Sequence, residues 1–182
     1  MDTLIKGFII SVSIILLQSC FGGASKTPDN EMSFHGVYFK YPSYWKSETE
    51  VVAESAYYIK CEERFSSGTM LLVSFFEGES EPAELLMNYL DGVNESSERV
   101  NVTTKFFSFR KYGNYDCQMV NYEISALTTK SYGNAYTFNA GGKTLLVVEQ
   151  SERHYDLKHD KFKNIQNSFI VDQPVDTSLS EE

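Results

Sequence analysis

The sequence has few of the residues on which many functions depend. Among 182 residues there are three cysteines, three histidines, four prolines and one tryptophan. The cysteines form no CxxC pair, so the pattern does not support thiol chemistry. Basic residues are also a minority, because 16 Lys and Arg stand against 25 Asp and Glu, and the formal net charge is −9. The acidic balance argues against nucleic acid as a partner, since no segment interleaves Lys or Arg with aromatic residues on the scale that a phosphate-binding face would need.

Long apolar runs are missing as well. Near the N-terminus, Lys6 precedes an apolar run from Phe8 to Leu17. Its length of about ten residues is typical of a signal-peptide core. A membrane-spanning helix needs roughly 20 apolar residues. We therefore predict a cleaved leader, residues 1–19, in preference to a transmembrane anchor.

The leader ends in Leu17-Gln18-Ser19-Cys20, which resembles the lipobox of bacterial lipoproteins. Gln18 departs from the usual pattern, in which a small residue occupies this position. The resemblance implies that the Cys20 thiol carries a diacylglyceryl group and that the leader is cut before it. Each buried methylene of an acyl chain contributes about 0.8 kcal/mol, so two or three chains hold a protein on its membrane. The alternative is an ordinary secretory leader that happens to precede a cysteine.

The remaining chain divides into three parts. Residues 20–33 are rich in Gly, Ser, Pro, Asn and Asp, and we expect a lipidated, flexible tether. No run of acids directly follows Cys20, so the expected location is the periplasmic face of an outer membrane. Residues 34–171 are expected to form one globular domain, and the acidic residues 172–182 a disordered tail.

Apolar patterning within the domain predicts seven strands and two helices. The expected strands are 34–41, 56–65, 69–76, 100–112, 115–127, 132–140 and 143–150. Turns such as Gly113-Asn114 and Gly141-Gly142 separate the later strands and favour antiparallel hairpins. Two continuous apolar runs, Met70–Val73 and Leu145–Val148, indicate strands covered on both faces.

One helix is expected after Ser80, which can cap it, and a second over residues 155–168. Each has an apolar stripe at helical spacing. Strands that need cover on both faces, together with two such helices, predict an α+β fold. Its antiparallel sheet of about six to seven strands would have helices on both faces.

Two motifs at the ends of the domain point to a family. Residues 38–45 read YFKYPSYW and resemble the opening strand and "YPxxW" motif of the PsbP-like superfamily. Residues 162–169 read FKNIQNSF and resemble its closing helix. The order of elements between them also matches. The resemblance implies an α/β/α sandwich in a family of mostly assembly or binding factors without a shared active site, so it transfers no catalytic residue.

Cys61 and Cys117 remain after Cys20 is assigned to lipid. In an oxidising compartment they could form a disulfide. They could equally remain two buried thiols that act as small apolar side chains. The sequence leaves both alternatives open.

Patterns for catalysis and for metal binding are incomplete. Ser80 lies in a GESEP segment that lacks the second glycine of a nucleophile elbow. Gly142-Lys143-Thr144 ends like a phosphate loop, but the leading glycine is replaced by Thr137. Candidate metal ligands cluster at His154, Asp156, His159 and Asp160, where the two histidines are five residues apart and not at the helical spacing of four. We predict no catalytic residue, no metal site and no cofactor.

These observations favour a membrane-anchored, non-enzymatic interaction or assembly module that docks onto a protein of the cell envelope. The alternative is a lipoprotein that binds a small ligand or glycan in a tyrosine-rich cleft, since the chain has 12 Tyr and 13 Phe. Packing of these rings in the core and between strands explains the same composition.

Overall fold

The computed structural model describes residues 29–64, 68–95, 100–126, 128–154, 156–158 and 160–173. The predicted leader, the lipidation site at Cys20, most of the predicted tether and most of the predicted tail lie outside these residues.

The centre of the domain is a seven-stranded sheet in which every neighbouring pair is antiparallel. Its strands, in spatial order, are β3 (Trp45–Ala53), β4 (Ala56–Glu63), β5 (Met70–Glu77), β9 (Lys143–Ser151), β8 (Thr129–Ala140), β7 (Tyr115–Ala126) and β6 (Val100–Tyr112). The antiparallel sheet and the hairpins between the later strands are thus confirmed. The edges of the sheet are β3 and β6.

A second, three-stranded sheet contains both ends of the described domain. Its order is β1 (Asn30–Phe34), β2 (Val37–Tyr41) and β10 (Ile170–Val171). The sequence predicted one strand over residues 34–41, but the chain reverses at His35 and Gly36, which both have positive φ. Strand β1 also begins four residues inside the predicted tether, because Met32 and Phe34 pack against the core.

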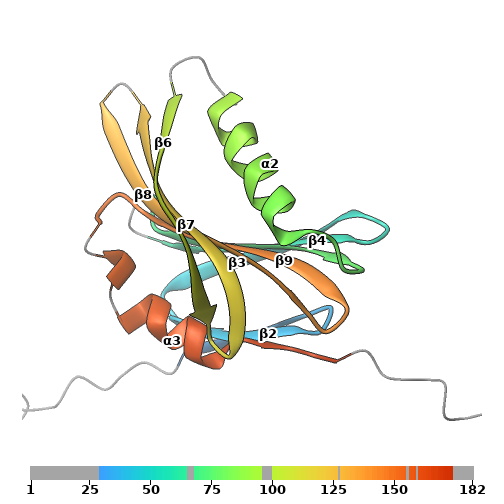
Figure 1. Ribbon diagram of the computed structural model, residues 1–182. Coiled ribbons are helices and arrows are strands. Elements are labelled where there is room, and N and C mark those ends of the chain that lie inside the picture. Colours follow the sequence, from blue (N-terminus) through green and yellow to red (C-terminus); the bar gives the residue numbers. More distant parts are fainter. Residues whose placement is uncertain are drawn as a thin grey trace, which may run out of the picture.

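Different elements cover the two faces of the large sheet (Figure 1). Helix α2 (Pro82–Glu95) lies on one face and buries Leu86 and Leu90 there. The other face is covered by the small sheet together with α3 (Asp160–Ser168), which follows the short 3-10 helix η2 (Asp156–Lys158). The expectation of helices on both faces is therefore incomplete, since β2 and its neighbours supply much of the second cover and the domain is mostly β.

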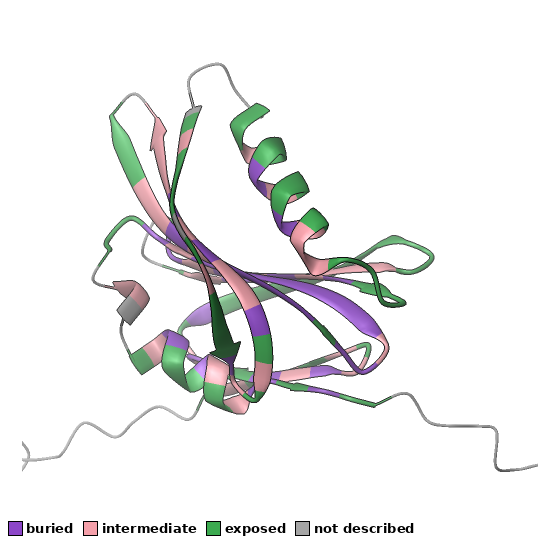
Figure 2. Ribbon diagram, in the orientation of Figure 1, coloured by how far each residue is buried: buried purple, intermediate pink, exposed green. Residues whose placement is uncertain are grey.

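The core residues follow from this layering. Lys143–Glu149 of β9 are all buried (Figure 2), as the apolar run Leu145–Val148 predicted for a strand covered on both faces. The same prediction for Met70–Val73 is confirmed in part, because Leu71 and Val73 are buried on one face whereas Leu72 on the other face is half-buried against the cluster beneath α2. Beyond β2 the chain enters β3 at Trp45, which is the only buried residue of that strand.

Candidate interaction surface

The most exposed apolar side chains of this domain include two phenylalanines of the edge strand β6. A β-bulge at Lys105 shifts the register between β6 and β7. After the bulge, Phe107 pairs with Val120 and Phe109 with Gln118, so both rings stand on the face that α2 covers. Phe107 is 54% exposed and Phe109 79% exposed, and Met87 of α2 is 51% exposed. Large apolar side chains exposed together on one surface are typical of an interaction site.

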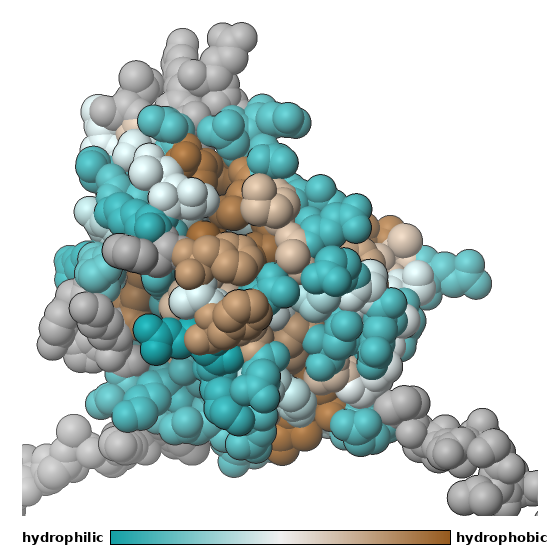
Figure 3. All heavy atoms as spheres, in the orientation of Figure 1, coloured by the Kyte–Doolittle hydropathy of each residue, from teal (hydrophilic) through white to brown (hydrophobic). Residues whose placement is uncertain are grey.

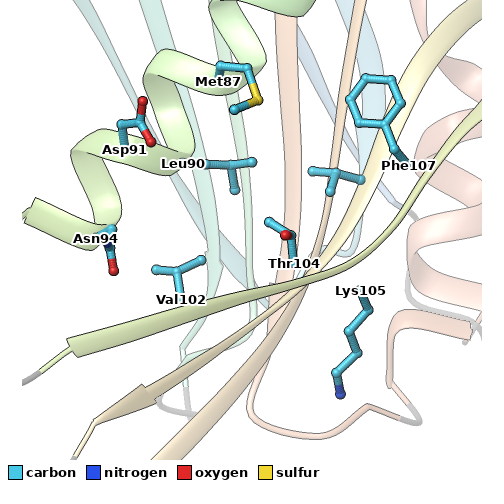
Figure 4. Close-up of a pocket in the computed structure, with 9 residues that line it drawn as sticks. Met87, Leu90, Asp91, Asn94, Val102, Thr104, Lys105 and Phe107 are labelled. Carbon is cyan, nitrogen blue, oxygen red and sulfur yellow. The ribbon is translucent and has the colours of Figure 1, made fainter.

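A groove of about 330 Å³ separates α2 from β6. Its apolar lining includes Leu90, Val102 and Val120, and Met87 and Phe107 line it nearer the opening (Figure 4). In Figure 4, Met87 and Phe107 approach the opening from the helix and from the strand, whereas Lys105 points away from it. Figure 3 shows apolar atoms over this part of the molecule with hydrophilic atoms around them. We call Met87, Phe107 and Phe109, with the groove between them, the α2–β6 surface.

A second groove of about 650 Å³ is lined by Phe109 of β6 and by Pro82, at the start of α2. Two of its lining residues, Gln118 and Thr137, are cross-strand neighbours on β7 and β8. Gln118 Oε1 and Thr137 Oγ1 are both buried without a hydrogen-bond partner. Leaving such a group unpaired costs roughly 1–3 kcal/mol. An occupant that offers a hydrogen-bond donor would relieve this cost.

Positive charge is concentrated on β6. The strand contains Lys105, Arg110 and Lys111 and no acidic residue, in a chain of net charge −9. Lys105 Nζ lies 2.6 Å from a carboxylate oxygen of Glu123, which also accepts from Lys130 at 2.7 Å. Hydrogen bonds from these two lysines lower the pKa of Glu123 to about 2. Lys111 forms a longer, exposed ion pair with Asp116, at 3.4 Å.

A buried polar cluster lies on the opposite face of the sheet, beneath α3. Glu149 is completely buried; it accepts a hydrogen bond from Gln166 Nε2 at 2.8 Å and one from the Tyr136 hydroxyl at 3.3 Å. Burial raises the pKa of Glu149 to about 7, although the hydrogen bonds from Gln166 and its neighbours oppose the shift. Glu149 lines neither groove, and its hydrogen bond from Gln166 joins α3 to the sheet.

The two remaining cysteines lie far apart. Cys61 on β4 and Cys117 on β7 are buried, free thiols. Three strands separate β4 from β7, and at about 4.8 Å per strand step the two residues are roughly 19 Å apart. A disulfide needs Cα atoms within about 7 Å. In the structure both cysteines are buried free thiols, which is the second of the two alternatives that the sequence leaves open.

The other residues singled out in the sequence have structural contacts. Ser80 is not the residue next to the helix, because α2 begins at Pro82, and the Ser80 hydroxyl donates instead to Thr144 Oγ1. Thr144 Oγ1 in turn donates to the Gly78 carbonyl, so the loop before α2 is fastened to β9. Asp156 accepts from Ser151. His159 lies outside the described residues, and within them no group of three or more His, Cys, Asp or Glu side chains is placed to hold a metal ion.

The two grooves do not form the tyrosine-rich cleft of the alternative hypothesis. Four tyrosines are core residues, namely Tyr41, Tyr112, Tyr122 and Tyr136. Neither groove is lined by a tyrosine. Among the residues that the structure describes, no helix has the length and apolar character needed to cross a membrane.

Comparison with known proteins identifies the fold. No family model matches the sequence, and no curated protein matches it. The solution structure of cyanobacterial PsbP (CyanoP) from Synechocystis sp. PCC 6803 matches with a TM-score of 0.61 and 16% identity, over 82% of this chain and 96% of that chain. A crystal structure from Bacteroides thetaiotaomicron VPI-5482 matches with a TM-score of 0.53 and 12% identity, over 82% of this chain and 50% of that chain.

The chain therefore has a PsbP-like fold, which confirms at the level of fold the resemblance drawn from residues 38–45 and 162–169. In the structure these two motifs meet, because Phe39 stacks on Phe169 with ring centroids 5.7 Å apart and Trp45 packs edge-on against Phe162 at the same separation. At these identities the likeness concerns architecture, and function has to be argued from the surface.

Proposed function

We propose that this protein is a lipid-anchored, non-enzymatic interaction or assembly module of a bacterial cell envelope, and that the α2–β6 surface receives its protein partner. The observation that carries the proposal is the exposure of Phe107 and Phe109 beside Met87 on an edge of the sheet. In isolation such exposure has a cost, because each apolar Å² left in water forgoes about 25 cal/mol. A partner that covers these side chains recovers that free energy.

The position of the chain ends supports the same proposal. Strands β1 and β10 flank β2 in the small sheet, which lies on the face opposite α2 (Figure 1). A tether that leads from Cys20 to Asn30 would therefore join the domain on the side away from Phe107 and Phe109. An anchored domain would in this way present the α2–β6 surface toward other envelope proteins and not toward its own lipid.

Anchoring is tested by replacing the lipidated thiol. We expect Cys20→Ser to move the protein from the membrane fraction to the soluble fraction, and we expect Ser19→Ala, which keeps a small residue before Cys20, to leave it on the membrane. Intact-mass analysis of native protein should show a mature chain that begins at Cys20 and carries acyl chains. An unmodified cysteine, or a mature terminus elsewhere, would remove the envelope role from the proposal.

The partner surface is tested by quantitative co-purification from native membranes. The double variant Phe107→Ser/Phe109→Ser removes exposed rings and should leave the fold intact. The matched control is Val51→Ser/Val52→Ser, which removes two exposed apolar side chains from the hairpin at the opposite edge, where they are 55% and 64% exposed. We expect the first variant alone to lose a specific protein. Equal recovery by both variants would contradict the proposal.

The small-ligand alternative has one supporting observation, the unpaired Gln118 Oε1 and Thr137 Oγ1 in the second groove. A ligand present at 100 times its Kd would stabilise the fold by about 2.7 kcal/mol. A thermal-shift screen with neutral sugars and amides measures this directly. Stabilisation that disappears in Thr137→Val would favour the alternative over the assembly role.

A further inference from the structure

The α2–β6 surface includes backbone as well as side chains. Strand β6 pairs with β7 along one side only, and no other described strand pairs with its outer side. Roughly half of the N–H and C=O groups of an edge strand point away from the sheet, and an extended chain can pair with them. Beyond the bulge, the segment from Phe106 to Tyr112 pairs with β7 without a further register shift, so its outer side has regular strand geometry.

The charges of β6 restrict what can pair with it. Lys105, Arg110 and Lys111 are exposed, and β6 has no acidic residue. Two copies of β6 side by side would bring Arg110, and the partly neutralised Lys105 and Lys111, against the same cations of the other copy, and like charges on neighbouring strands destabilise pairing. The bulge at Lys105 also interrupts continuous pairing of edge with edge. The like charges and the bulge disfavour pairing with a second copy of β6, whereas an incoming strand with acidic side chains would be attracted.

We propose that β6 accepts an extended, acidic segment of a partner protein as an eighth strand of the large sheet. Successive side chains of an added strand alternate between the faces. Those on the α2 side lie beside Phe107 and Phe109 and cover them, while acidic side chains on the opposite face pair with Lys105 and Arg110. Main-chain hydrogen bonds supply affinity, and the two rings and the cations supply specificity. This inference rests on the proposed function, of which it specifies the partner and the mode of binding.

Residue-resolved amide hydrogen exchange of the full-length chain tests the inference. The probe is a synthetic, end-blocked peptide of about nine residues that alternates valine and glutamate, and the control peptide has lysine in place of glutamate. With the acidic probe at roughly ten times its Kd, we expect outward-facing amides of Phe106–Tyr112 to exchange about tenfold more slowly. The other edge strand, β3, is an internal control. It carries Glu48 and Glu50 and should be unaffected by the acidic probe.

Variants separate the two sources of recognition. Arg110→Glu, which reverses the charge on the face opposite Phe107 and Phe109, should abolish the preference for the acidic probe over the lysine peptide. Phe109→Ser should weaken binding of both, and because Phe109 is exposed its loss should not affect folding.

Three results would overturn the inference. They are the absence of slowed exchange at the highest soluble peptide concentration, equal protection by both peptides, and self-association of the chain through β6 and β3 in sedimentation experiments. A further outcome is that the Phe107→Ser/Phe109→Ser variant loses its partner in co-purification although the acidic peptide leaves the β6 amides of the natural protein unprotected. In that case the proposed surface stands and strand addition is wrong. If neither effect appears, the proposed function fails as well.

Discussion

Replacing Glu149 by glutamine should make the protein more stable at alkaline pH. Glu149 is fully buried beneath α3, where its carboxyl accepts hydrogen bonds from Gln166 and Tyr136. Burial raises its pKa from the ordinary value of 4.5 to about 7. The folded protein therefore binds this proton more tightly than the unfolded chain does. Stability falls as the pH rises from about 4.5 to about 7, and the loss is complete above that window.

The size of the effect follows from the two pKa values. Each pH unit between them corresponds to about 1.4 kcal/mol, so the ionised carboxyl costs at most about 3 kcal/mol of unfolding free energy at pH 8. At pH 5 the cost is about 1 kcal/mol or less. Glutamine has nearly the same shape and keeps an acceptor for Gln166 Nε2, but it does not ionise. We expect the stability advantage of Glu149→Gln over the natural protein to grow by about 2 to 3 kcal/mol between pH 5 and pH 8.

Urea unfolding at the two pH values, analysed by linear extrapolation, measures this difference. Every other titrating group is present in both proteins, so its contribution cancels in the comparison. Glu79→Gln, in the exposed loop before α2, is a control for the loss of one surface charge. An advantage of Glu149→Gln that is the same at pH 5 and pH 8 would refute the reasoning.

The remaining predictions concern glycines and thiols. Gly141→Ala should destabilise the fold by more than about 1 kcal/mol, since φ is +59° and a Cβ would overlap the Asp172 carbonyl oxygen. Gly92→Ala, inside α2 with open space around it, should stabilise by roughly 0.5–1 kcal/mol, and thermal unfolding compares the two. Burial raises the pKa of Cys61 to about 12 and that of Cys117 to about 11, so a thiol reagent at pH 8 should label both only after unfolding. Labelling of the folded protein at either thiol, or a melting temperature that drops on reduction, would contradict the burial and the free state of these cysteines.

Much of the fold was predictable because local patterns agree with the tertiary structure. Glycine turns and alternating apolar residues placed the bounds of β6, β7 and β9 within about two residues, and an apolar stripe placed α2. Strand β3 could not be predicted from its pattern. Its residues Lys46–Ala53 are all exposed, so they show no apolar alternation, and only pairing with β4 makes them a strand.

The α2–β6 surface was less accessible to sequence reasoning. Phe107 and Phe109 lie in a predicted strand, and a strand of aromatic residues is usually read as part of the core. They are exposed because β6 is an edge strand. Strand β6 is at the edge because β9 pairs with β5 on one side, so that β8, β7 and β6 follow outward on the other. Such pairing between distant segments leaves no local signal. The unpaired Gln118 and Thr137 are likewise evident only when β7 and β8 are placed side by side.

The most direct test of the partner surface is site-specific photocrosslinking in native membranes. A photoreactive phenylalanine analogue is placed at position 109, and at position 52 of the opposite edge as the control. We expect one discrete adduct from position 109, joined to an extended acidic segment of another envelope protein, and we expect this adduct to be lost when Cys20 is replaced by serine. No adduct at position 109, or the same adducts from positions 109 and 52, would contradict the assignment of the α2–β6 surface as the place where this protein meets its partner.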